Sequence, residues 1–150
     1  MTADRPALAR DHARLATVAA QLRDDRLVGD PAAVESGRLT VAQAHDRARI
    51  ITAIAAQWAD FVAARPLAPQ SDRWHGTGGR EGAIEQEMRD ALAGILKIAA
   101  SKRPELLDAV EALHWWQQPA DRSHWPVSRL TRAHGDADAD RFWAAEREAA

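Results

Sequence analysis

Apolar residues recur at helical spacing along most of this chain, and this periodicity constrains the fold more than any other feature of the sequence. Leu8, Leu15 and Leu22 repeat every seven residues, and further along the chain Ile51 and Trp58 share one face of a second periodic segment. Spacings of three, four and seven residues place side chains on one face of an α-helix. The pattern therefore predicts long amphipathic helices.

The composition supports helices over strands. The chain has 34 alanines, two phenylalanines and no tyrosine among its 150 residues, whereas strands favour β-branched and aromatic side chains. With 46% hydrophobic and 28% charged residues, the chain is typical of a globular protein. Its length suits one domain. We therefore expect a single all-α domain.

Capping and turn residues predict where the helices begin and end. Thr40 is a good N-cap, and Gln43 three residues later completes a capping-box pattern. Residues 27–31, which include Gly29 and Pro31, predict a break after the first helix. The helices expected from these signals cover residues 5–26, 41–64, 81–100, 104–117 and 137–148, with a loop over 118–135 and an acidic start to the last helix over 135–140.

These elements predict a small helical bundle built from two antiparallel hairpins and a C-terminal helix. Residues 1–64 form a long helical hairpin, residues 65–80 a Pro- and Gly-rich linker, and residues 81–150 the second helical part. The N-terminal residues lack an apolar segment of the kind found in signal peptides, and no stretch is apolar enough to span a membrane. We expect a cytoplasmic protein.

The charge balance and the absence of cysteine exclude several classes of function. There is no cysteine, which excludes disulfides, thiolate catalysis and cysteine-ligated zinc. The net charge of −2 does not favour a general polyanion-binding protein. A DNA-binding regulator stays an alternative, with residues 42–54 as a recognition helix and Arg47 and Arg49 reaching the DNA.

Histidines offer a second alternative. His114, His124 and His134 recur at ten-residue intervals, and imidazole is a common zinc ligand. A metal-dependent enzyme or a zinc-binding protein would use this region. The chain has no His-x-x-x-His or His-Glu-x-x-His motif, which speaks against a metal site of that kind. We expect no cofactor.

Tryptophans gather near the C-terminus, where four of the six fall within the last 36 residues. Tryptophan and arginine are enriched among the residues that anchor protein interfaces. This region therefore predicts a partly exposed aromatic surface that binds a partner protein or a second copy of the chain. Its expected members are His114, Trp115, Trp116, Arg122, His124, Trp125, Arg129, Phe142 and Trp143.

One stretch resembles a known group of proteins. Val34-Glu-Ser-Gly37-Arg38-Leu39-Thr40, followed at a distance by Ala53-Ile54, is similar to small helical accessory proteins of bacteriophages and prophages. The similarity covers about residues 15–56. It implies a phage or prophage accessory protein and carries over no catalytic residue. Together with the aromatic region, it predicts a non-enzymatic helical protein whose function is to bind another protein or itself.

Overall fold

The computed structural model describes residues 5–66, 83–120 and 127–149. Within these ranges the chain is all-α, as the periodicity predicts, with no named strand. The helices run in the order η1 (Ala7–Arg10), α1 (His12–Glu35), α2 (Val41–Val62), α4 (Glu85–Lys102), η3 (Pro104–Leu106), α5 (Leu107–Gln117) and α6 (Arg129–Ala149), where η marks a short 3₁₀ helix. The linker predicted over 65–80 lies almost entirely outside the described residues.

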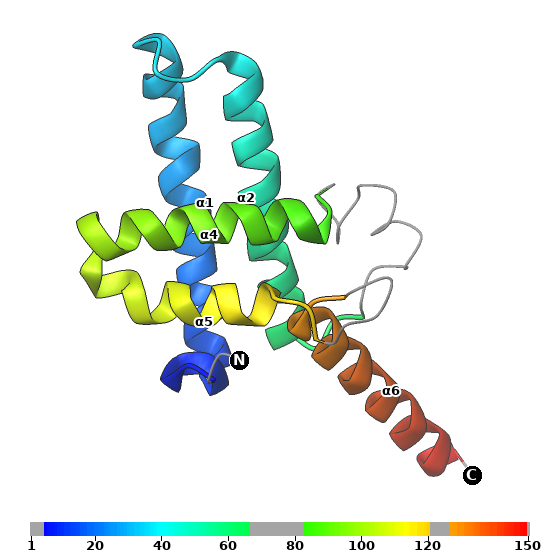
Figure 1. The fold of residues 1–150 in the computed structure, drawn as a ribbon. Coiled ribbons are helices and arrows are strands. Elements are labelled where there is room, and N and C mark those ends of the chain that lie inside the picture. Colours follow the sequence, from blue (N-terminus) through cyan, green and yellow to red (C-terminus); the bar gives the residue numbers. More distant parts are fainter. Residues whose placement is uncertain (1–4, 67–82, 121–126, 150) are drawn as a thin grey trace.

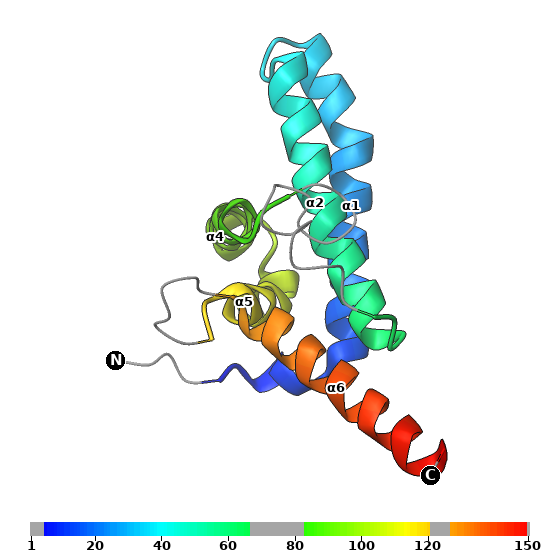
Figure 2. The same cartoon turned by 90° about the vertical axis from the view of Figure 1, so that its right-hand side faces the viewer.

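Two antiparallel hairpins cross each other. The first pairs α1 with α2, and the second, made of α4 and α5, lies across the lower half of the first (Figure 1). The tip of the first hairpin therefore extends beyond the second hairpin at one end. Helix α6 leaves the other end and points away from the rest of the molecule in both views (Figures 1 and 2).

The core lies where the two hairpins cross. Trp58 of α2 is fully buried, and its indole packs edge-to-face with Trp116 of α5 at 6.0 Å between ring centroids. Phe61 and His12 complete this aromatic centre. The apolar faces of the crossing helices fill the remainder of the core, with fully buried Leu15, Ile51, Ile54, Met88, Leu92 and Leu113.

The predicted cap of α2 is confirmed. Gln43 N donates to Thr40 Oγ1 at 3.0 Å, and Thr40 N donates to Gln43 Oε1 at 2.9 Å. These reciprocal bonds form a capping box, which satisfies two backbone donors that a helix start would otherwise leave unpaired.

Thr40→Ala should therefore lower the free energy of unfolding by about 1 kcal/mol, since Gln43 N loses its acceptor. Urea unfolding followed by circular dichroism measures this difference. Thr17→Ala is a control, because the Thr17 hydroxyl only donates to a carbonyl on an exposed turn of α1. Equal stabilities for the Thr40 variant and the native chain would show that the cap is not needed.

The break predicted at residues 27–31 is wrong, because α1 continues through it to Glu35. Pro31 lacks an N–H, so the carbonyl of Leu27 loses its helical partner, but both residues lie on the exposed side of α1. Asp30 is buried and accepts two hydrogen bonds, of 2.8 and 3.1 Å, from Arg47 of α2. This contact holds the end of α1 against α2.

The loop expected up to residue 135 and the acidic helix start over 135–140 are also wrong, because α6 already begins at Arg129. Ser128 caps it, since Ser128 Oγ accepts from Thr131 N at 3.0 Å. The carboxylate of Glu85 in α4 accepts from Ser128 N at 2.7 Å and from Thr131 Oγ1 at 2.5 Å. A carboxylate from another helix thus stabilises this helix start.

Candidate functional site: the aromatic C-terminal region

Trp115 is half-buried at the edge of the crossed hairpins, in contact with two arginines. The guanidinium groups of Arg129 and Arg5 lie 4.2 and 5.3 Å from its ring centroid. Arg129 Nη1 also donates to the Trp115 carbonyl at 2.9 Å, and burial together with the charge of Arg5 lowers the pKa of Arg129. These contacts fasten the start of α6 to the end of α5.

Trp116 is not part of an exposed surface, which corrects the prediction for this residue. Only 9% of it is exposed, and its ring packs against Trp58, Phe61 and His12. Trp116 Nε1 donates to the carbonyl of Ala9 at 2.8 Å, so the single polar atom of the side chain is satisfied inside the fold. Trp116 is a core residue.

Two histidines of the metal-binding alternative have partners within the fold. His114 is half-buried, its Nε2 lies 2.9 Å from the Gln118 side-chain amide, and burial lowers its pKa. His134 is buried and donates from Nε2 to the Arg65 carbonyl at 2.6 Å. The third, His124, lies outside the described residues. No group of three or more residues that could hold a metal ion occurs in the described parts of the chain.

Within the described residues, only the first turns of α6 are anchored to the other helices. Leu130, Thr131 and His134 are its buried residues, and the Glu85 carboxylate fixes its first turn. Sequence reasoning missed Glu85, because an acidic residue at the start of one helix does not reveal that it caps another. From Ala139 onward nearly every described residue of α6 is exposed.

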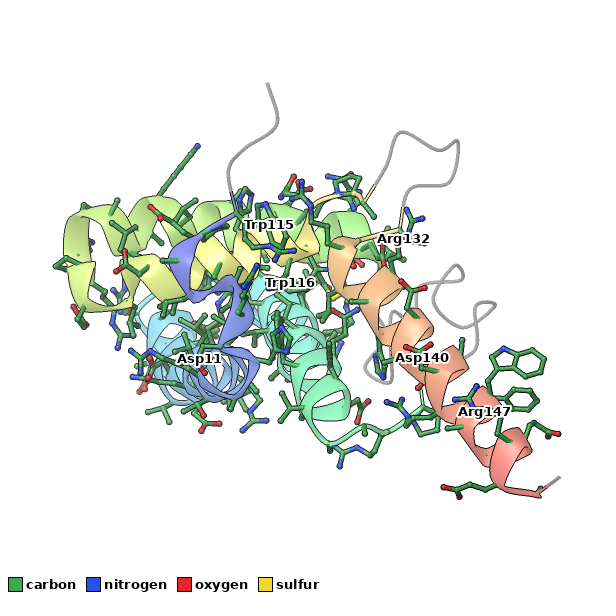
Figure 3. All side chains as sticks on the ribbon, turned by 90° about the horizontal axis from the view of Figure 1, so that it is seen from below. Asp11, Trp115, Trp116, Arg132, Asp140 and Arg147 are labelled. Atoms are coloured by element: carbon green, nitrogen blue, oxygen red, sulfur yellow. The ribbon has the colours of Figure 1, made fainter. Side chains whose placement is uncertain are left out.

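The exposed part of α6 carries an unburied aromatic pair. Phe142 and Trp143 are 58% and 60% exposed, and their rings pack edge-to-face at 5.3 Å between centroids. Phe142 follows Arg129, which contacts Trp115, by thirteen residues. Thirteen residues span about 20 Å along a helix. Figure 3 shows Trp115 near the start of α6 and Arg147 near the far end of this helix.

The single aromatic surface predicted from the sequence is therefore two separate features. Trp115 with Arg129 forms a half-buried cluster at the start of α6, and Phe142 with Trp143 forms an exposed pair on its projecting end. The sequence could not separate them, because the distance between them depends on where α6 begins. The other predicted members, Arg122, His124 and Trp125, lie outside the residues that the structure describes.

The two arginines of the DNA-binding alternative each form an ion pair between two helices. Arg47 binds Asp30 of α1, and Arg49 binds Glu87 of α4 through hydrogen bonds of 2.6 and 3.1 Å. Both guanidinium groups are directed to carboxylates of neighbouring helices. Sequence reasoning missed these pairs, because the partners are 17 and 38 residues away. The DNA-binding alternative stays a prediction, in which both cations already have carboxylate partners within the fold.

Glu87→Gln should lower the free energy of unfolding by about 1 kcal/mol near neutral pH. The hydrogen bond from Arg49 lowers the pKa of Glu87 below its ordinary value of 4.5, and a bond from Ile84 N adds to this. The Glu87 carboxylate therefore stabilises the fold at pH values above its ordinary pKa of 4.5. This contribution is lost as the pH falls through the lowered pKa of the folded state.

Urea unfolding of both proteins at neutral and at acidic pH tests this contribution. The difference in unfolding free energy should shrink in acid, where the native Glu87 becomes protonated. Glu105→Gln is a matched control, because its 3.4 Å contact with Arg103 is exposed and should contribute little. A difference that persists unchanged in acid would contradict the assigned role of the Glu87 charge.

No helix within the described residues is long and apolar enough to cross a membrane. Comparisons of the chain with protein-family models, with curated proteins and with solved structures find no match. The features that bear on function are therefore those of the molecule itself, above all the exposed aromatic pair on α6.

Proposed function

We propose that this protein binds a partner protein through the projecting end of α6, with Phe142 and Trp143 as anchors. The observation that carries the proposal is the exposure of both rings, 58% and 60%, on a helix end that extends away from the rest of the molecule (Figure 2). Large aromatic side chains are enriched among interface anchors and lose much exposed apolar area when a partner covers them.

The spacing of the apolar residues suits a helix that lies in a groove. Ala139, Phe142 and Trp143 occupy positions i, i+3 and i+4, which share one face of a helix. The small side chain of Ala139 lets a partner approach the backbone beside the two rings. The anchored first turns of α6 hold this face in place before a partner arrives, which lowers the entropy lost on binding.

The charge of α6 indicates the chemistry of the partner. From Gly135 to the end of the chain there are five acidic residues and two arginines. This excess of negative charge favours an apolar groove with a basic rim over pairing of two α6 helices, which would repel each other. The similarity of residues 15–56 to phage accessory proteins stays a prediction, and it would make the partner a phage or host protein.

Capture from an extract of the organism that encodes the chain tests the proposal, using the full-length protein. Phe142→Ser with Trp143→Ser should abolish capture of the partner while leaving the melting temperature almost unchanged, since both side chains are exposed. The matched control is Val28→Ser with Val41→Ser, which removes two exposed apolar side chains, 79% and 74% exposed, from the first hairpin. This control should retain capture.

The partner's binding is then measured with purified components. A complex that forms with the native chain and with the hairpin control, but not with the α6 variant, supports the proposal. Equal binding by all three proteins would overturn it. Sedimentation at several concentrations examines self-association, the second candidate. An α6-dependent dimer would make the partner a second copy of this chain instead of a basic-rimmed protein.

A further inference from the structure

A pocket of about 250 Å³ is lined by residues of α1, α2, α4, η3 and α5 and of the turn after α4. That turn lies on the opposite side of the molecule from α6 (Figure 1). One part of its lining is charged, with three arginines and two aspartates from α1, α2 and the turn after α4. A pocket with both apolar and charged lining suits an amphiphilic ligand. The apolar lining consists of Leu22, Ile95, Ile98, Ala99, Leu106 and Val110.

The charges of the pocket do not balance, because three arginines face two aspartates. Asp30 accepts two hydrogen bonds from Arg47, at 2.8 and 3.1 Å, and Asp25 accepts one from Arg103 at 2.6 Å. Each of the two carboxylates is therefore engaged by an arginine other than Arg26. Among the described charges that line the pocket, that of Arg26 has no such partner.

Arg26 is half-buried and makes one long hydrogen bond to the neighbouring helix. Its Nη1 donates to the backbone carbonyl of Arg47 at 3.4 Å, and within the described residues no carboxylate forms an ion pair with it. A guanidinium has five N–H donors, so most of those of Arg26 are available. Burial, together with the charge of Arg47, lowers the pKa of Arg26 to about 10, and the charge of Asp30 opposes this only in part.

A partly buried cation without a counter-ion is unfavourable, and an incoming anion would relieve this. We propose that the pocket binds a small carboxylate with an apolar tail, its carboxylate on Arg26 and its tail on the accessible apolar lining formed by Ile95 and Ile98. The planar fork of a guanidinium matches a carboxylate, which it can bind with two parallel hydrogen bonds. The neighbouring Asp25 and Asp30 disfavour a dianion such as phosphate.

The volume sets the size of the ligand. A protein cavity of about 150 Å³ accommodates benzene, which has six carbon atoms. A pocket of about 250 Å³ therefore accommodates roughly ten non-hydrogen atoms, as in a medium-chain fatty acid or an aryl carboxylate. Octanoate has this size and chemistry and serves as the probe.

Calorimetric titration of the full-length protein with octanoate tests the proposal. The native chain should bind one equivalent saturably, and Arg26→Met should weaken binding at least tenfold, since a charged hydrogen bond is lost. The uncharged analogue 1-octanol should bind the native chain more weakly than octanoate and should not distinguish the two proteins. Arg23→Met is the matched control, because Arg23 lies on α1 but pairs with its neighbour Asp24 outside the pocket.

The outcomes separate the proposal from its competitors. Absence of saturable octanoate binding, or unchanged binding by Arg26→Met, would overturn it. Equal affinity for octanoate and 1-octanol would show an apolar pocket without an anion site. Displacement of octanoate by inorganic phosphate would show a general anion site. Either result contradicts the proposal. Ile98→Ser provides a second variant, which keeps Arg26 and should weaken octanoate binding by removing part of the apolar lining.

Discussion

Replacing Trp58 with alanine should lower the free energy of unfolding by about 4 kcal/mol, the largest effect that we expect from a single substitution in this protein. Trp58 is fully buried at the crossing of the two hairpins, where it contacts His12 of α1, Trp116 of α5 and Phe61 of its own helix. Removing the indole leaves a cavity between α2, α5 and the start of α1. The neighbouring rings are rigid and cannot easily fill it.

Urea unfolding followed by circular dichroism at 222 nm measures the effect without relying on tryptophan fluorescence. Trp58→Phe should be much less destabilising, because phenylalanine fills part of the space and Trp58 Nε1 has no hydrogen-bond partner within the described residues. Trp143→Ala is the exposed control and should change the unfolding free energy by less than about 0.5 kcal/mol. A Trp58→Ala protein as stable as the Trp143→Ala protein would show that the aromatic centre is not the core.

Replacing Asp30 with asparagine should lower the free energy of unfolding by about 2 to 3 kcal/mol. The Asp30 side chain is 12% exposed and is the counter-ion of Arg47, while Arg26 lies in the same pocket. Without the charge of Asp30, two neighbouring guanidinium groups repel each other across a partly buried space. The pair is only partly buried on the arginine side, so the expected effect lies below that of a fully buried ion pair.

A double-mutant cycle with Arg47→Met tests the origin of this loss. Removing both charges should restore part of the stability, since the uncompensated guanidinium disappears with Arg47. Asp24→Asn is the control, because Asp24 is an exposed carboxylate on the same helix, paired with Arg23. Losses of equal size for the Asp24 and Asp30 variants would show that the ion pair to α2 has no special role. The helix content should also fall in the Asp30 variant, where the end of α1 beyond Pro31 loses its attachment.

Local signals in the sequence were sufficient for the helices whose ends depend on adjacent residues. Thr40 and Gln43 predict the start of α2, and the structure shows both reciprocal bonds. The apolar periodicity predicts the buried faces of α1 and α2, where Leu15, Ile51 and Trp58 are fully buried. Capping and periodicity act within one or two helical turns, so a single sequence contains them.

The wrong predictions share a physical cause, which is a partner from a distant part of the chain. Pro31 would break an isolated helix, but α1 continues, and Asp30 beside it is bound to Arg47. The start of α6 falls within the expected loop, but Glu85 accepts hydrogen bonds from its first turn. In both places a contact between helices outweighs the local propensity, as tertiary packing commonly does.

The candidate sites also divide into features set by local sequence and features set by contacts between distant segments. The sequence by itself determined an all-α chain, the apolar faces of its first hairpin and an aromatic C-terminal region. Only the tertiary structure decided that Trp116 is buried while Trp143 is exposed, because that depends on which helix covers each ring. It also decided that no carboxylate in the described parts of the chain pairs with Arg26, because ion pairs are set by the distances between side chains that folding brings together.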